Sequence, residues 1–245
     1  MSTNAGSDDA RWTRMTPPPD EPDCYSFFGG LAQVDDYREI YAFGWQGIAH
    51  WQEGSPWAVQ LKTDEYFIAS VLLFERSPRD VWAVGNGGGT SPAQWGTPAD
   101  YGAIFHYAWP GTNWERVALP GISLHPQQIL SQIIYNRNHN QLFVVGTEGL
   151  ILRGVLQGTN WAWKQLPSGT EHALKSVAWD PDFTLWVVGG DGLILRSTDE
   201  GETWVECACY DEEGSRVRAN LGRVRFFGRQ GWIVGDTALL KCELP

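Results

Sequence analysis

A run of β-forming residues that ends in glycine recurs along the chain, and this repeat constrains the fold more than any other feature. The clearest copy, LWVVGGDGLILRSTDEGETW at 185–204, places two β-rich runs around a glycine turn and ends with an acidic turn and Trp. The interval of 61 residues between the second and third copies contains a 14-residue insertion. Five copies with a period in the forties predict a β-propeller. The glycines are Gly44, Gly85, Gly146, Gly189 and Gly235, at spacings of 41, 61, 43 and 46 residues.

Each repeat predicts four strands. The glycine run is the second strand, a tight turn leads to a third strand of G-x-I-x-H/R type, and the fourth is centred on a tryptophan. We expect the glycine that closes the second strand to permit positive φ in a two-residue turn such as Thr147 and Glu148 or Gly190 and Asp191. The predicted inner strands are 31–34, 68–74, 130–135, 174–179 and 221–227, and the tryptophans are Trp57, Trp114, Trp161 and Trp204.

The fifth repeat lacks a fourth strand, because the sequence stops soon after LLKCEL at 239–244. The stretch ARWTRM at 10–15 resembles NWERVA at 113–118, and Trp12 can therefore complete the last sheet. We expect an all-β fold: a five-bladed β-propeller of four-stranded antiparallel blades in one domain, 1–245, closed by pairing of the N- and C-terminal strands. The predicted blades are 30–62, 67–119, 129–167, 173–209, and 220–245 plus 10–16.

The segment STDEGETW fits the S-x-D-x-G-x-T-W pattern of the Asp box, found in sialidases and other BNR-repeat propellers. With the preceding WVVGGDGLILR it resembles the photosystem II stability/assembly factor family, whose members are propellers of such repeats. The resemblance implies a structural hairpin in which Asp199 accepts backbone N–H bonds and Trp204 anchors the turn. The sialidase FRIP-type motif is absent. The Asp-box residues are Ser197, Asp199, Gly201, Thr203 and Trp204.

The sequence predicts a protein without catalytic residues, metal or cofactor. None of its five histidines forms H-x-x-x-H or H-E-x-x-H, and GNGGGTS at 85–91 lacks the lysine of a phosphate-binding loop. One basic residue falls at the same third-strand position of each repeat, which favours local pairing with carbonyls or hairpin acids over a shared anion site. These residues are His50, His106, Arg153, Arg196 and Lys241.

The longer connections indicate a binding surface, because they carry aromatic and charged residues that a bare loop does not need. In a propeller, the connections between second and third strands share one face with those that lead to the next blade. Some of the rings can instead fold back into the channel, and the acids and arginines near 210–218 can neutralise one another or form a bipolar recognition edge. The candidate binding residues are Tyr25, Tyr66, Trp95, Tyr101, Tyr210, Asp211, Glu212, Glu213, Arg216 and Arg218.

The formal net charge of −11 argues against nucleic acid as a partner and is compatible with a basic protein. No signal peptide or membrane span is evident, and the four cysteines lack metal or C-x-x-C spacing, so we expect reduced thiols in the cytoplasm. The first hypothesis is a bacterial protein-binding scaffold, in a specific form an immunity protein that caps a basic toxin or effector. The alternatives are a sugar-binding lectin-like propeller and a glycosidase.

Overall fold

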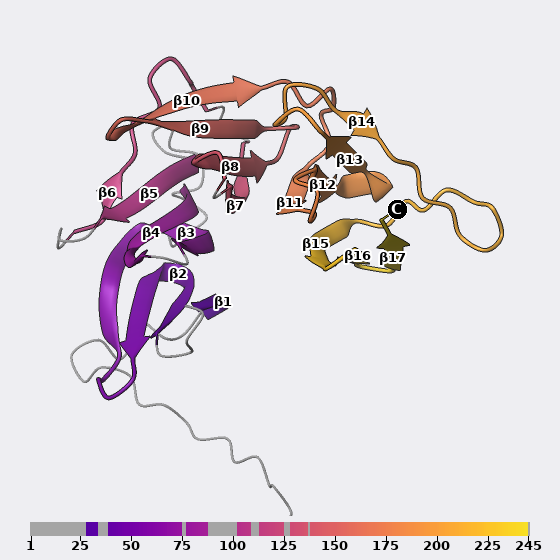
Figure 1. Cartoon of the computed structure of the whole chain (residues 1–245). Coiled ribbons are helices and arrows are strands. Elements are labelled where there is room, and N and C mark those ends of the chain that lie inside the picture. The colour runs from indigo at the N-terminus through magenta and orange to yellow at the C-terminus, as the bar shows by residue number, and fades with distance from the viewer. Residues whose placement is uncertain are drawn as a thin grey trace, which may run out of the picture.

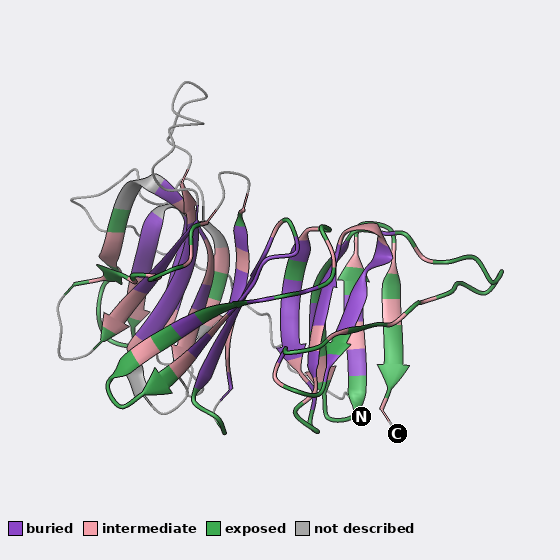
Figure 2. Cartoon of the chain, turned by 90° about the horizontal axis from the view of Figure 1, so that it is seen from above, coloured by how far each residue is buried: buried purple, intermediate pink, exposed green. Residues whose placement is uncertain are grey.

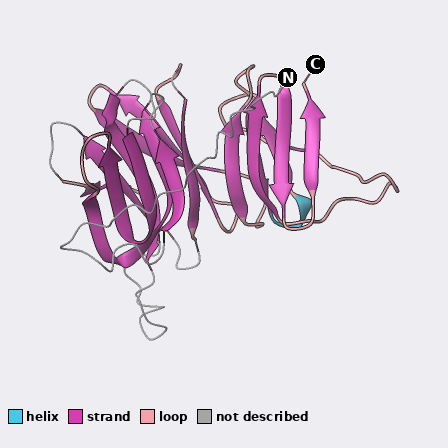
Figure 3. Cartoon of the chain, turned by 90° about the horizontal axis from the view of Figure 1, so that it is seen from below, coloured by secondary structure: helices cyan, strands magenta, loops and turns pink. Residues whose placement is uncertain are grey.

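The fold is built from antiparallel β-sheets. The computed structural model describes residues 28–33, 39–74, 77–87, 102–108, 113–124, 128–136 and 138–244. Figure 3 shows that strands dominate these residues, with one short 3₁₀ turn, η2 (Gly190–Gly192). Extended strands suit this sequence because it is rich in β-branched and aromatic residues and is punctuated by glycines.

The first sheet contains the first two repeats. Its strands, hydrogen-bonded in this order, are β1 (Phe28–Gln33), β2 (Glu39–Gln52), β3 (Ala58–Phe74), β4 (Ser77–Gly87), β5 (Gly102–Ala108) and β6 (Glu115–Arg116).

β2 doubles back on itself. The rings of Tyr41 and His50 stack with centroids 4.5 Å apart, whereas nine residues of straight strand would separate them by about 30 Å. The segment therefore supplies both the second and the third strand of the first repeat. β3 is shared in the same way: residues 58–62 pair with β2, and residues 66–74 pair with β4.

The remaining repeats form three further sheets. The third and fourth repeats each make a four-stranded sheet, and the last makes a sheet of three strands. The strands of the third are β7 (Leu130–Asn136), β8 (Gln141–Gly146), β9 (Ile151–Gln157) and β10 (Asn160–Leu166). Those of the fourth are β11 (Leu174–Trp179), β12 (Leu185–Gly189), β13 (Ile194–Ser197) and β14 (Val205–Glu206), and those of the last are β15 (Leu221–Phe227), β16 (Gln230–Gly235) and β17 (Leu239–Glu243).

Successive repeats stack face to face. β1 contacts β3, β3 contacts β7, β7 contacts β11 and β11 contacts β15, so the first strands of the repeats follow one another in an arc (Figure 1). Four hydrophobic clusters lie between consecutive repeats; the last, for example, joins Val188 and Ile194 to Leu221 and Val224. Burial is concentrated in the middle of these strands, and exposed residues gather on the last sheet (Figure 2).

Polar side chains on the inner strands join one sheet to the next. The backbone N–H of Val177 donates to Gln132 Oε1 at 2.9 Å, and that of Val224 donates to Ser176 Oγ at 3.1 Å. Gln132 and Ser176 occupy the same position, next to an irregularity of register in their strands. The stacking is therefore held by buried hydrogen bonds as well as by apolar contact.

Two predictions about local structure are wrong. The glycines that close the second strands do not supply the positive φ: it falls on Glu148 and Gly149, and on Asp191 and Gly192, one residue later than predicted. The fourth strands of three repeats are not centred on their tryptophan. They begin immediately after it. β3 follows Trp57, and the two-residue strands β6 and β14 follow Trp114 and Trp204, whose rings pack against the apolar clusters.

Some predicted features lie outside the described residues. These are the segment 10–16 with Trp12, the greater part of the insertion 86–101, and the aromatic residues Tyr25, Trp95 and Tyr101. The last sheet has three strands among the described residues, and β17 forms one edge of it. No described helix is long and apolar enough to cross a membrane.

Candidate interaction surface

The turns between second and third strands dock on the connections that enter the inner strands. Thr147 N–H donates to the carbonyl of Ile129 at 2.9 Å, within the same repeat, and Gly149 N–H donates to the carbonyl of His172 at 3.0 Å, in the next one. The fourth repeat makes equivalent bonds from Gly190 to Ala173 and from Gly192 to Ala219. Turns and connections therefore lie at one common end of the sheets.

The connection from β14 to β15 carries a hairpin, residues 209–217, which we name the projecting arm. Figure 1 shows it extending away from the sheets. Val217 N–H donates to the Cys209 carbonyl at 2.9 Å, and Tyr210 and Arg216 form a β-bridge. Asp211 closes the tip, because its Oδ1 accepts from the N–H groups of Glu213 and Ser215 at 3.0 and 2.8 Å. The arm is ordered by its own hydrogen bonds rather than by packing.

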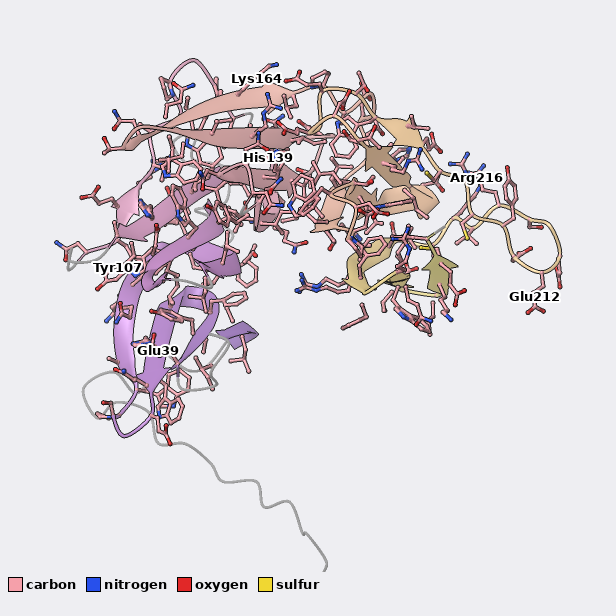
Figure 4. The ribbon with its side chains drawn as sticks, in the orientation of Figure 1. Glu39, Tyr107, His139, Lys164, Glu212 and Arg216 are labelled. Atoms are coloured by element: carbon pink, nitrogen blue, oxygen red, sulfur yellow. The ribbon has the colours of Figure 1, made fainter. Side chains whose placement is uncertain are left out.

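The arm presents an aromatic ring and two acids to solvent. Tyr210 is 62% exposed, and Glu212 and Glu213 lie at the tip. Figure 4 shows Glu212 at the far end and Arg216 on the stem. The structure thus brings together Tyr210, Asp211, Glu212, Glu213 and Arg216 of the predicted binding residues.

The arginines near the arm form local ion pairs. Arg216 pairs with Glu206 of β14, and Arg218 Nη1 lies 2.9 Å from Asp191 Oδ2 in the turn of the fourth repeat. Acid and base next to this connection therefore neutralise one another at the base of the arm, whereas Glu212 and Glu213 remain at the tip.

Tyr66 does not belong to this surface. It is only 7% exposed, and its ring packs edge-on against Phe105 with centroids 5.2 Å apart. The structure does not bring Tyr66 together with the other candidates, because its ring, on β3, packs in the core between the first two repeats.

The Asp-box residues shape the hairpin between β13 and β14. Asp199 Oδ1 accepts from Thr203 N–H at 2.9 Å, Asp199 Oδ2 accepts from Thr203 Oγ1 at 2.6 Å, and Ser197 Oγ donates to Asp199 at 2.8 Å. These hydrogen bonds, of which those from Thr203 have the largest effect, lower the pKa of Asp199 to about 2. Trp204 packs against the core cluster between the third and fourth repeats. The Asp-box residues therefore have a structural role: they hold the hairpin in shape and anchor it to the core.

The tip of this hairpin is clamped by the preceding repeat. Arg153 Nη2 donates to Glu202 Oε1 at 2.6 Å and Arg153 Nη1 donates to the Glu200 carbonyl at 3.0 Å, while Lys164 Nζ lies 3.0 Å from Glu202 Oε2. His139 also pairs with Glu200. Figure 4 shows Lys164 and His139 over the third sheet. The sequence did not reveal this clamp, because its partners lie 38 to 61 residues apart.

The five basic third-strand residues act locally. His106 stacks on Trp82 with centroids 4.0 Å apart and lies 2.6 Å from Asp80, and Lys241 Nζ lies 5.6 Å from the Trp232 ring. His50 and Arg196 face Tyr41 and Trp186 in the same way, and Arg153 is paired with Phe143 across the strands. Each lies beside an aromatic ring of its own sheet. Pairing with hairpin acids, as predicted, is seen for Arg153, whose acidic partners belong to the hairpin of the next repeat.

No group of His, Cys, Asp and Glu side chains suited to a metal ion occurs within the described ranges. Cys207, Cys209 and Cys242 are free thiols, and burial raises the pKa of Cys207. Cys24 lies outside those ranges.

A comparison with known protein families supports the type of repeat that the sequence suggested. No curated protein matches the chain. The model of the family described as Photosynthesis system II assembly factor YCF48 matches residues 159–243, about a third of the chain, which span β10 to β17. The resemblance inferred from STDEGETW and its neighbours is therefore confirmed: the C-terminal repeats are similar to those of this BNR-type propeller family.

Proposed function

We propose that the protein is a non-catalytic scaffold that binds another protein through the end of its sheets that carries the projecting arm. The observation that carries the proposal is the arm itself, which is ordered by backbone hydrogen bonds and exposes Tyr210 beside two acids. A preordered aromatic element loses little conformational entropy on binding. The matched family is described as an assembly factor, which also favours a role in binding proteins.

The partner that fits this surface is basic. The chain has a net charge of −11, and Glu212 and Glu213 stand at the tip of the arm. Acidic surfaces speed encounter with basic partners and fix their orientation. The specific form of the proposal is an immunity or inhibitor protein of the bacterial cytoplasm that caps a basic toxin or effector and blocks its active site.

The proposed scaffold is a closed five-bladed propeller. The stacked repeats and the three-stranded last sheet support closure by residues 10–16, which would add a fourth strand to the edge of β17. A closed ring fixes each repeat between two neighbours and would hold the arm in one orientation.

The experiment is capture of a partner from a lysate of the source cells with three forms of the full chain. The arm variant combines Tyr210→Ser, Glu212→Lys and Glu213→Lys. The control carries Glu53→Lys and Glu115→Lys, which change exposed acids away from that end of the sheets. We expect the wild type and the control to bind one basic protein, and the arm variant to bind it about tenfold or more weakly, a loss of about 1.4 kcal/mol.

Salt provides the second part of the test. Binding of a basic partner should weaken as the salt concentration rises from about 0.05 M to about 0.5 M, because the exposed charges are screened. Equal binding by the wild type and the arm variant would contradict the proposed surface. An acidic partner, or binding insensitive to salt, would contradict the proposed partner.

A further inference from the structure

A cysteine of the fourth repeat lies on the face of its sheet that meets the last repeat. Cys207 follows β14, and its N–H donates to the carbonyl of Ile194 at 2.8 Å, which continues the pairing of β13 with β14. Residues opposite one another in an antiparallel pair share a face, so Cys207 lies on the side of Ile194. Both belong to the apolar contact between the fourth and last repeats, where Cys207 is packed against the cluster.

Cys242 approaches the same contact from the last sheet. It lies on β17 two residues after Leu240, which packs against that cluster, so the two side chains share one face. Its Sγ lies over Gly231 of β16, because a Cβ on that glycine would be only 2.6 Å from the sulfur. The glycine leaves room for the thiol on the side of the fourth repeat. Cys207 and Cys242 therefore face one another across the two sheets.

The two thiols differ in exposure and acidity. Cys242 is exposed, whereas Cys207 is half-buried. Burial raises the pKa of the Cys207 thiol; the charge of Arg196 opposes this rise, and the nearby thiol of Cys242 adds to it. A thiolate reacts with oxidants and a thiol does not, so the raised pKa slows the reaction of Cys207. Cys242 is the thiol that meets an oxidant first, and Cys207 is the neighbour that completes the reaction.

We propose that Cys207 and Cys242 form a reversible disulfide when the protein is exposed to a peroxide. The Cys242 thiolate attacks one peroxide oxygen, the O–O bond breaks, and the leaving hydroxide takes up a proton to become water. Cys242 is then a sulfenic acid. The Cys207 thiolate attacks its sulfur, the S–O bond breaks, and a second water leaves. The two thiols together lose two electrons and two protons, and hydrogen peroxide is reduced to two waters.

The bond requires a local movement that the chain around Cys207 allows. Packed sheets lie about 10 Å apart, whereas the Cβ atoms of a disulfide lie about 4 Å apart. β14 contains two residues and Cys207 lies beyond them, so this stretch has few strand hydrogen bonds to lose. A dithiol reductant reverses an exposed bond by exchange. The thiols are thus reduced at rest, as in most cytoplasmic proteins, and are joined only under oxidation.

The disulfide would fix the base of the projecting arm, which begins two residues after Cys207 at Cys209. In the reduced protein the stem is closed by the bond from Val217 N–H to the Cys209 carbonyl. A covalent link from Cys207 to β17 restrains the chain where it enters the stem. This inference concerns the redox state of the chain and goes beyond partner binding, so it stands or falls separately from the proposed partner.

Peptide mapping of the full chain after treatment with hydrogen peroxide tests the bond. We expect the wild type to lose the mass of two hydrogen atoms and trypsin to release residues 197–216 joined to residues 242–245. Cys209→Ala is the matched control, because it removes the other cysteine of the first peptide, and it should form the bond at the wild-type rate. Cys207→Ala should stop at a sulfenic acid on Cys242, trapped with dimedone. Cys242→Ala should react about tenfold or more slowly.

Hydrogen exchange tests the effect on the arm. The amide of Val217 should exchange more slowly in the oxidised wild type than in the reduced one, and dithiothreitol should restore the faster rate. Equal exchange in the two forms would overturn the proposed effect on the arm.

The mapping is decisive in the wild type alone, so it does not depend on the folding of any variant. A bond between Cys207 and Cys209, a bond to Cys24, or bonds only between molecules would overturn the proposal. The absence of any bond at a peroxide concentration that oxidises free cysteine would overturn it as well.

Discussion

Glycine ends the second strands of the third and fourth repeats because a neighbouring backbone passes too close for any side chain. A Cβ on Gly146 would lie 2.3 Å from the carbonyl oxygen of Ile129, and one on Gly189 would lie 2.1 Å from that of Ala173. The recurrence of these glycines is visible in the sequence, but its cause is not, because the crowding comes from a strand at least 16 residues away.

Substitutions at Gly149 and Gly158 distinguish the effect of steric crowding from that of backbone strain. Both have φ of +64°, but a Cβ on Gly149 would lie 1.9 Å from the Thr170 carbonyl oxygen, whereas nothing lies within 4 Å of one on Gly158. Gly158→Ala should cost about 1 kcal/mol, and Gly149→Ala at least about 2 kcal/mol more. Urea unfolding measures both, and equal losses would mean that the turn does not dock as described.

Asp199 should make stability depend on acid pH. Its pKa is about 2 in the folded protein and 3.8 ordinarily, so its hydrogen bonds stabilise the fold fully above pH 3.8. This contribution should be lost as the pH falls from 3.8 towards 2. Asp199→Ala should melt at a lower temperature at pH 6 and show a weaker pH dependence in that window. Glu212→Gln, on the projecting arm, serves as the control.

At the scale of elements, the inner strands were predictable and the outer ones were not. β11 and β15 begin and end where the repeat placed them. Both alternate buried apolar residues with exposed ones along part of their length, a pattern typical of a strand with one face against a neighbouring sheet. β6 and β14 contain two residues each, and nothing in their composition marks them as strands. The projecting arm was located from its acids and its tyrosine, but its hairpin depends on the Asp211 turn.

The clamp between the third repeat and the Asp-box hairpin should depend on Arg153 rather than on Lys164. The Arg153 side chain is 13% exposed and bonds two acidic residues, whereas Lys164 is 57% exposed. Arg153→Met should cost about 2 kcal/mol, because Glu200 and Glu202 lose a charged partner. Lys164→Met should cost no more than about 0.5 kcal/mol. Urea titration compares the two, and a larger loss for Lys164 would refute the assignment.

Ser176 should contribute to stability through the strand that follows it. It is fully buried, and its hydroxyl accepts from Val224 N–H. Ser176→Ala would leave that N–H without its acceptor and should cost about 1–2 kcal/mol. Hydrogen exchange at Val224 should accelerate accordingly. Unchanged exchange there would show that the sheets are held by apolar contact alone.

At the scale of the whole molecule, the repeat predicted the β class, the order of strands and the stacking of successive sheets. It also placed the unfinished sheet at the C-terminal end. The position of Tyr66 was not predictable, because alternation cannot tell a ring that enters the core from one that faces solvent. The acceptor role of Gln132 and Ser176 was equally hidden, since it depends on the distance between two sheets.

Closure of the ring is the central claim about the molecule, and a distance between its two ends tests it most directly. Spin labels at Thr13 and Leu240 of a full-length chain with its native cysteines replaced would report that distance by pulsed electron resonance. Adjacent strands lie about 4.8 Å apart, so closure predicts one narrow distribution, within about 20 Å once label length is included. A broad distribution centred well beyond that distance would contradict the closed five-bladed ring.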